Sequence, residues 1–220
     1  ANYDGPRVLA QLSAEAGIPF IHISTDYVFD GSKGVPYVET DETNPTGVYG
    51  RTKRDGEARV MAAAGKPIIL RTAWVYSDTG KNFVKTMLGA GAKLPKLRVV
   101  ADQKGSPTAA ADLAGAILDI IQRIESGGWK PDYAGIFHVT GGGETTWHGL
   151  AVAIFEEARR HDGPSPEVEP ITTADWPTPA RRPADSRLDN SKLGHVFGVR
   201  LPPWRHSLAR TVDKLLGPQG

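Results

Sequence analysis

The sequence predicts an α/β protein in which helices flank a parallel sheet and a smaller lobe follows towards the C-terminal end. Short apolar runs rich in branched side chains alternate along the chain with longer segments of helical periodicity. This alternation of strand and crossover helix is the unit that builds parallel sheets. The chain of 220 residues, 40% of them hydrophobic, also has enough apolar side chains to bury a sizeable core.

The expected elements follow one another in regular order. Apolar residues recur at helical spacing over residues 5–17, and Gly17 is placed to end this helix in a left-handed conformation. The run 19–25 is typical of a buried parallel strand, because it is short, apolar and rich in branched residues. A polar connection rich in Gly, Pro, Asp and Thr follows over 26–47. The next expected elements are a helix at 48–64, a strand at 67–72, a helix at 82–90, a strand at 97–100, a helix at 109–125, a strand at 135–139 and a helix at 146–160.

Prolines interrupt the pattern after Gly163, and only two short helices are expected there, at 190–197 and 204–216. This composition predicts a smaller lobe that decorates the sheet.

The composition argues against several classes of function. The 26 Lys and Arg residues nearly balance the 25 Asp and Glu residues, so no overall field would recruit nucleic acid or an anionic membrane. No run of about 18 apolar residues predicts a membrane span, and the absence of cysteine excludes disulfides and thiolate chemistry. The absence of cysteine also makes the cytoplasm the expected location. The six histidines are scattered along the chain, so no metal site is expected.

One motif has the residue types for general acid catalysis. Tyr49 and Lys53 form Y-x-x-x-K, and side chains four residues apart on a helix face the same way. A neighbouring ammonium is expected to favour the phenolate, which makes the phenol a better proton donor for carbonyl reduction. Ser24 and Thr25 lie at the end of the preceding strand, where α/β sheets place their ligands. On the motif alone a solvated surface pair stays an open alternative.

Several segments together resemble a known family. They are 22–31 (HISTDYVFDG), 49–53 (YGRTK), 70–76 (LRTAWVY), 102–108 (DQKGSPT) and 182–188 (RPADSRL). In order and spacing they are similar to segments of the dTDP-4-dehydrorhamnose reductases, which are extended short-chain dehydrogenase/reductases. The similarity spans nearly the whole chain.

The resemblance implies that NADPH or NADH reduces the 4-keto group of dTDP-4-dehydro-L-rhamnose to give dTDP-L-rhamnose. It implies that Tyr49 donates a proton to the C4 oxygen, that Lys53 binds the nicotinamide ribose and tunes Tyr49, and that Thr25 orients the oxygen. Further residues that it places near the nicotinamide are Arg71, Thr72 and Ala73. The residues that it places at the nucleotide sugar are Asp26, Tyr27, Trp74, Gln103, Arg182 and Arg187.

Plainer roles stay open for several of these residues. Trp74 follows a strand and could simply pack in the core. Gln103 is in a turn that Thr108 could close by capping the following helix. Arg182 and Arg187 suit a nucleotide diphosphate, because a guanidinium forms charge-assisted forked hydrogen bonds, but each could equally form a surface ion pair.

The chain departs from the family pattern in one respect. Extended reductases begin with a strand, a G-x-x-G-x-x-G turn and a helix, and none of these precedes Ala1. The turn Gly141–Gly143 matches no phosphate-binding motif either. We therefore expect a partial Rossmann-like fold that lacks the N-terminal cofactor-binding half. Residues 1–140 would form the C-terminal part of the Rossmann-like domain with insertions of the substrate lobe, and 141–220 mainly the small substrate-binding lobe. A non-catalytic regulatory or binding subunit is the alternative function, and a homodimer is considered as the assembly.

Overall fold

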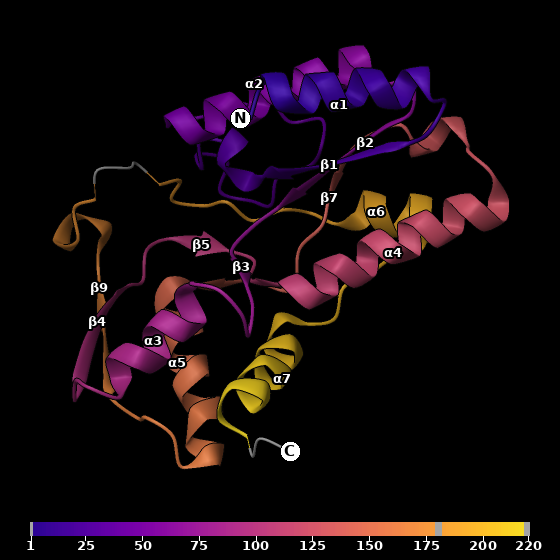
Figure 1. Ribbon diagram of the computed structural model, residues 1–220. Helices are drawn as coiled ribbons and strands as arrows, with labels where there is room; N and C mark the ends of the chain where they lie inside the picture. The colour runs from indigo at the N-terminus through magenta and orange to yellow at the C-terminus, as the bar shows by residue number, and fades with distance from the viewer. Residues whose placement is uncertain (1, 179–181, 218–220) are drawn as a thin grey trace.

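The computed structural model describes residues 2–178 and 182–217, and its central sheet has three parallel strands (Figure 1). These are β1 (Phe20–Thr25), β2 (Pro67–Thr72) and β7 (Gly135–His138), in the order β1-β2-β7. The register pairs Thr25 with Thr72, so the carboxyl ends of the two strands lie at the same edge. All three strands were predicted from the sequence to within a residue.

Helices cover both faces of this sheet (Figure 1). On one face lie α1 (Asp4–Glu15) and α2 (Val48–Ala63), which pack on Ile69 through Ala10 and Val60. On the other face lie α4 (Ala110–Gly127) and α6 (Ser191–Phe197), whose buried residues share a cluster with Ile68, Leu70 and Phe137. Alternate side chains of a strand point to opposite faces of the sheet. Because helices cover both faces, every residue of β2 is buried. Gly17 follows α1 with φ +68°, as predicted.

A second body of the fold surrounds α5 (Trp147–Ala158), with α3 (Phe83–Gly91) and α7 (Trp204–Leu216) packed against it. Here β4 (Lys96–Val100) pairs in parallel with β9 (Glu167–Ile171). The strand predicted at 97–100 therefore exists but does not join the central sheet. Its burial alternates along the strand, which is typical of a strand with one exposed face. No strand was predicted at the position of β9, which is short and contains a proline.

Short elements connect the two parts. β3 (Val75–Tyr76) pairs with β6 (Thr108–Ala109), and β5 (Lys104–Gly105) pairs with β8 (Thr145–Thr146). The 3₁₀ turns are η1 (Asp26–Val28), η2 (Pro131–Tyr133), η3 (Arg159–His161) and η4 (Thr173–Asp175).

The prediction that Thr108 caps the following helix is wrong. Helix α4 has Ala109 as its N-cap residue, and no side chain caps it. Thr108 lies one residue earlier, in β6, where its hydroxyl oxygen accepts a hydrogen bond from the Gly141 N–H at 3.3 Å. Pairing of β6 with β3 sets the position of Thr108 and takes it out of the capping position.

Within the described residues, no helix is both long enough and apolar enough to cross a membrane.

Candidate active site

The predicted catalytic residues come together where β1 ends and α2 begins. Thr25 is the last residue of β1, and its hydroxyl oxygen accepts a hydrogen bond from the Tyr27 N–H at 3.2 Å, which starts the turn η1. Tyr49 lies in the first turn of α2, and its ring meets the Tyr27 ring edge-on at 5.9 Å between centroids. The sheet edge and the helix N-terminus therefore present a hydroxyl and a phenol side by side.

Gly50 allows this close approach of helix and turn. A Cβ atom at this position would lie 2.1 Å from the Tyr27 carbonyl oxygen and 2.9 Å from the Pro45 side chain. Carbon and oxygen atoms do not approach so closely, so a residue without a side chain is needed here. The glycine next to Tyr49 thus has a packing function that the Y-x-x-x-K pattern does not indicate.

The environment of Tyr49 raises the pKa of its phenol above the ordinary value of 10. Partial burial is the main cause, and the negative charge of Asp26 adds to it, whereas hydrogen bonding with the Thr25 side chain acts the other way. In the protein alone the phenol is therefore harder to ionise than free tyrosine, and the expected effect of Lys53 on it stays a prediction. Tyr49 is 52% exposed and stays protonated at neutral pH, as a proton donor must.

Lys53 points from α2 back to the sheet. Its ammonium group donates a hydrogen bond to the Ile23 carbonyl oxygen at 2.6 Å. Partial burial lowers the pKa of Lys53, and the negative charge of Glu57 raises it. An ammonium group has three N–H donors, so two stay available beside the one that binds Ile23.

A buried ion pair lies one helical turn beyond Lys53. Arg71 of β2 donates to Glu57 of α2 through Nε at 2.9 Å and through Nη2 at 2.7 Å, and the two side chains are 3% and 4% exposed. The side chain of Arg71, which the resemblance placed near the nicotinamide, is therefore turned under α2. Glu57 lies four residues after Lys53 on the same helix, but the sequence pattern alone assigns it no role.

Among the described residues, six buried side-chain atoms on the central strands and the adjoining turn η1 have no hydrogen-bond partner. They are the hydroxyl oxygens of Ser24 and Thr72, Oδ2 of Asp26, Nη1 of Arg71, and Nε2 of His22 and His138. Buried polar atoms are normally hydrogen-bonded, so such a cluster marks a place where a ligand is able to supply the partners. Ala73 directly follows Thr72 and is buried.

Asp26 is 2% exposed and lies next to both tyrosines. Its Oδ1 atom accepts a hydrogen bond from the Thr25 hydroxyl at 3.1 Å. Burial raises its pKa from 3.8 to about 6, against a smaller effect of hydrogen bonding from Ser186. The positive charge of the exposed Arg182 acts to lower the pKa of Tyr27, which indicates that the two side chains lie near each other. Burial and Asp26 nevertheless raise it overall.

Trp74 adopts a rare conformation for a residue with a side chain, with φ +47°. Its ring stacks on that of Trp147 with centroids 3.6 Å apart and an angle of 8° between the planes. Gly105 lies against the same indole, since a Cβ there would be 2.3 Å from the ring. These contacts fit the packing role that was left open, and contact with a sugar stays a prediction.

The remaining predicted residues lie on the loops around 103 and 187. Gln103 is buried and donates to the Thr173 hydroxyl at 3.0 Å. Arg187 donates to the carboxylates of Asp185 and Glu144 at 2.6–2.9 Å and to the Gly34 carbonyl at 2.9 Å. Arg187 would therefore have to exchange these partners to bind a diphosphate, whereas Arg182 is exposed.

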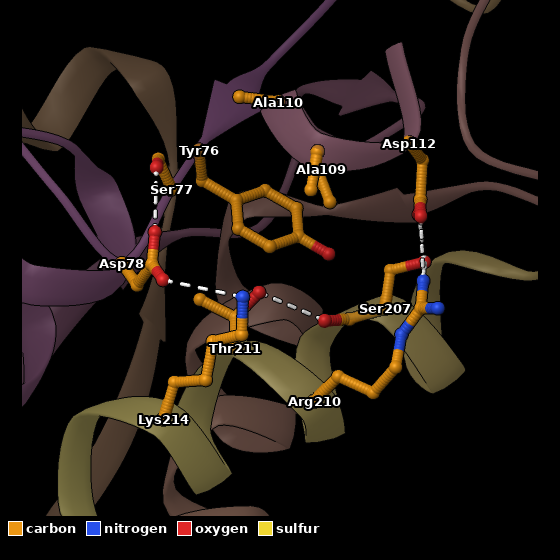
Figure 2. A pocket seen from close by; sticks show the side chains of 11 residues that line it. Tyr76, Ser77, Asp78, Ala109, Ala110, Asp112, Ser207, Arg210, Thr211 and Lys214 are labelled. Carbon is orange, nitrogen blue, oxygen red and sulfur yellow. Dashed lines mark hydrogen bonds and ion pairs between the residues drawn. The ribbon is translucent and has the colours of Figure 1, made fainter. Parts of the chain in front are cut away.

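A cavity of about 270 Å³ lies elsewhere, at the start of α4 and beside α7 (Figure 2). Ser207 and Arg210 point towards Asp112 there. The Nη2 atom of Arg210 lies 2.6 Å from Oδ1 of Asp112. Lys214 pairs with Asp78 at 3.4 Å. Each cation in this cavity has a carboxylate partner, so the cavity has no strong preference for a charged ligand.

The parallel sheet and the Thr25, Tyr49 and Lys53 side chains at its carboxyl edge define a reductase of the extended short-chain dehydrogenase/reductase class. The family model described as "RmlD substrate binding domain" matches residues 1–216. The chain belongs to this family.

Known proteins with the same features are closely similar. The chain is 48% identical to a dTDP-4-dehydrorhamnose reductase of Sinorhizobium fredii and 40% identical to one of Escherichia coli K12. These alignments cover 98% and 97% of the chain and 72% and 71% of the relatives.

Solved structures show the same architecture. A crystal structure of a dTDP-4-dehydrorhamnose reductase from Clostridium acetobutylicum superposes with a TM-score of 0.88 at 42% identity, covering 97% of this chain and 72% of that one. The enzyme from Bacillus anthracis, solved in complex with NADP, superposes with a TM-score of 0.85 at 34% identity, covering 96% and 70%. These structures confirm the predicted α/β fold.

Proposed function

We propose that this protein reduces the C4 keto group of dTDP-4-dehydro-L-rhamnose to dTDP-L-rhamnose with NADPH or NADH as hydride donor. The observation that carries the proposal is the cluster of Thr25, Tyr49 and Lys53 at the carboxyl edge of the sheet. The relatives described above are named for this reaction, and none of them is named as a non-catalytic subunit. The Bacillus anthracis enzyme holds NADP, which favours NADPH as the cofactor.

The chain offers groups that fit such a cofactor and its substrate. Lys53 retains two N–H donors for ribose hydroxyls, and the half-exposed Tyr49 lies beside it. The unpartnered hydroxyls of Ser24 and Thr72 add polar groups at the same edge. A bound reduced nicotinamide supplies the hydride.

The proton comes from the chain itself. Thr25 and Tyr49 hydrogen-bond the C4 oxygen, and Tyr49 transfers its phenolic proton to that oxygen as negative charge develops there. The raised pKa of Tyr49 keeps the phenol protonated at neutral pH. The same shift raises the free energy needed to form the phenolate. The Lys53 ammonium, four residues along the same helix stripe, offsets part of this cost.

The nucleotide sugar would be held by groups around the same edge. We assign the unpartnered Oδ2 of Asp26 to a sugar hydroxyl and the exposed Arg182 to the diphosphate, beside Tyr27. Roles for Trp74, Gln103 and Arg187 in the substrate pocket, and for the Arg71–Ala73 turn at the nicotinamide, are part of the same proposal. A homodimer in the cytoplasm is also proposed, and sedimentation of the purified protein checks the oligomeric state.

Replacement of Tyr49 by Phe in the full-length gene product tests the proposal. We expect the rate of NADPH oxidation with the keto sugar to fall by about 10²–10⁴-fold, because the general acid is lost, while NADPH still binds. Tyr133→Phe is the matched control, since Tyr133 is buried on the other face of the sheet and its change should leave the rate unaltered. Turnover by Tyr49→Phe at the parent rate would show that the proton donor lies elsewhere.

A further inference from the structure

We infer that Glu57, clamped by Arg71, is a positioning residue for the reaction: its carboxylate fixes a negative charge one helical turn from Lys53, on the helix stripe that carries Tyr49. This inference rests on the proposed reductase function and deepens it, because it adds a group behind the catalytic residues that acts through Lys53.

The clamp fixes the Glu57 carboxylate in one orientation. Two parallel hydrogen bonds of 2.9 and 2.7 Å join it to Arg71, a forked geometry that leaves little rotational freedom. Behind the pair, the guanidinium of Arg71 lies over the Phe29 ring at 5.1 Å. Because β2 carries Arg71 and α2 carries Glu57, the pair ties the helix of the catalytic residues to the sheet.

Glu57 is placed to act on Lys53. The two residues are four apart on α2, and side chains at this spacing lie on one face of a helix. Lys53 is half-buried and bound to Ile23 at the strand, so burial works against its charge. The negative charge of Glu57 opposes that effect, and a neutral Lys53 would no longer favour the phenolate of Tyr49.

Two histidines also face this cluster, and neither carries a charge at neutral pH. His22 of β1 lies beside Lys53 and Glu57, and burial together with Lys53 lowers its pKa to about 4. His138 of β7 lies beside Arg71, and burial together with Arg71 lowers its pKa to about 3. Both imidazoles are therefore neutral at pH 7, and the side-chain charge that acts on Lys53 at this pH is that of Glu57.

A purely structural role is the rival explanation. Removing the charge from one partner of a buried ion pair destabilises most proteins, whether or not the pair acts on catalysis. The test therefore needs readouts that stability alone does not change: the pH profile of kcat/KM, the KM for NADPH, and the pKa of Lys53 followed by NMR of isotope-labelled lysine.

The central variant is Glu57→Gln in the full-length protein, which keeps the shape of the side chain and removes its charge. We expect kcat/KM at pH 7.5 to fall about tenfold and the KM for NADPH to rise, in keeping with the loss of one oriented charge at a catalytic group. We expect the pKa of Lys53 to fall and the alkaline limb of the pH profile to move to lower pH with it. Glu57→Asp, which keeps the charge, should restore most of the pH profile.

The matched control is Asp112→Asn. Asp112 is a partly buried carboxylate that pairs with Arg210 in the cavity of Figure 2, away from the site. This variant should lose stability without any change in the pH profile or in the KM for NADPH. If Glu57→Gln does not fold, Glu57→Gln/Arg71→Gln removes both charges and leaves no uncompensated ion, and the same shift in the Lys53 pKa is expected.

The possible outcomes distinguish a failure of the role inferred for Glu57 from a failure of the proposed reductase function. A Glu57→Gln enzyme that loses stability but keeps the parental pH profile, KM and Lys53 pKa would overturn the inference and leave the reductase function intact. A parent protein that fails to reduce the keto sugar would overturn the proposed function, and the Lys53 pKa would still decide whether Glu57 controls that charge.

Discussion

Replacement of Gly50 by Ala tests whether the approach of α2 to η1 creates the active site. The added Cβ would lie 2.1 Å from the Tyr27 carbonyl oxygen, and contacts below 3.0 Å are essentially never observed. The helix and the turn therefore have to part by about 1 Å, a misplacement that is able to cost about 10²-fold in rate. The obstructing atom is backbone, so no side-chain rotation relieves the clash.

The effect on stability has two opposing contributions. Overpacking of this kind costs about 1–3 kcal/mol, and a helical Ala is about 1 kcal/mol more favourable than Gly. We expect a net loss of about 0–2 kcal/mol, which lowers the Tm of a chain of this size by up to several degrees.

Gly115→Ala provides the control for helix propensity. Gly115 lies within α4, and no atom lies within 4 Å of its added Cβ. This variant should gain about 0.5–1 kcal/mol, opposite in sign to Gly50→Ala. Thermal unfolding and the rate of NADPH oxidation are the assays. Parental activity and an unchanged Tm in Gly50→Ala would refute the argument that this close contact sets the position of Tyr49.

Three further predictions concern packing and pH. Gly105→Ala would place a Cβ 2.3 Å from the Trp74 ring, so we expect a loss of about 1–3 kcal/mol in urea unfolding and a changed tryptophan fluorescence; an unchanged unfolding midpoint would contradict the stacked geometry. His138 is fully buried with a pKa of about 3, well below its ordinary 6.5, so the unfolded chain binds a proton that the folded chain does not, and stability should fall as the pH drops from 6.5 towards 3. His138→Gln should flatten this dependence, and an equally steep acid transition in that variant would refute the assignment. Asp26 has a folded pKa of about 6, above its ordinary 3.8, so its effect is opposite, and it should reduce stability as the pH rises from 4 to 6. The stability of Asp26→Asn, measured by unfolding over that range, should lack this contribution. An identical pH dependence in parent and variant would argue against it.

Much of the site could be predicted from local sequence, because its key residues sit at element boundaries. Thr25 ends a strand that is recognisable from its branched apolar residues, and Tyr49 and Lys53 follow at helical spacing in the next helix. Where strands are parallel, their carboxyl ends must share one edge, so the meeting of these residues followed from the order of the elements. The strand predicted at 97–100 shows the limit of this approach, since periodicity does not reveal which strand it will pair with.

The sequence by itself determined the order and approximate bounds of the main helices and strands, since these depend on spacings of a few residues. It also predicted Thr25, Tyr49 and Lys53 as the candidate catalytic residues. Only the tertiary structure decided that Glu57 and Arg71 form a buried pair, that Gly50 meets the Tyr27 carbonyl, and that the phenol of Tyr49 has a raised pKa. Contacts between residues distant in the chain, and the burial that shifts a pKa, depend on how the elements pack, and a local pattern contains no information about the atoms on the other side of such a contact.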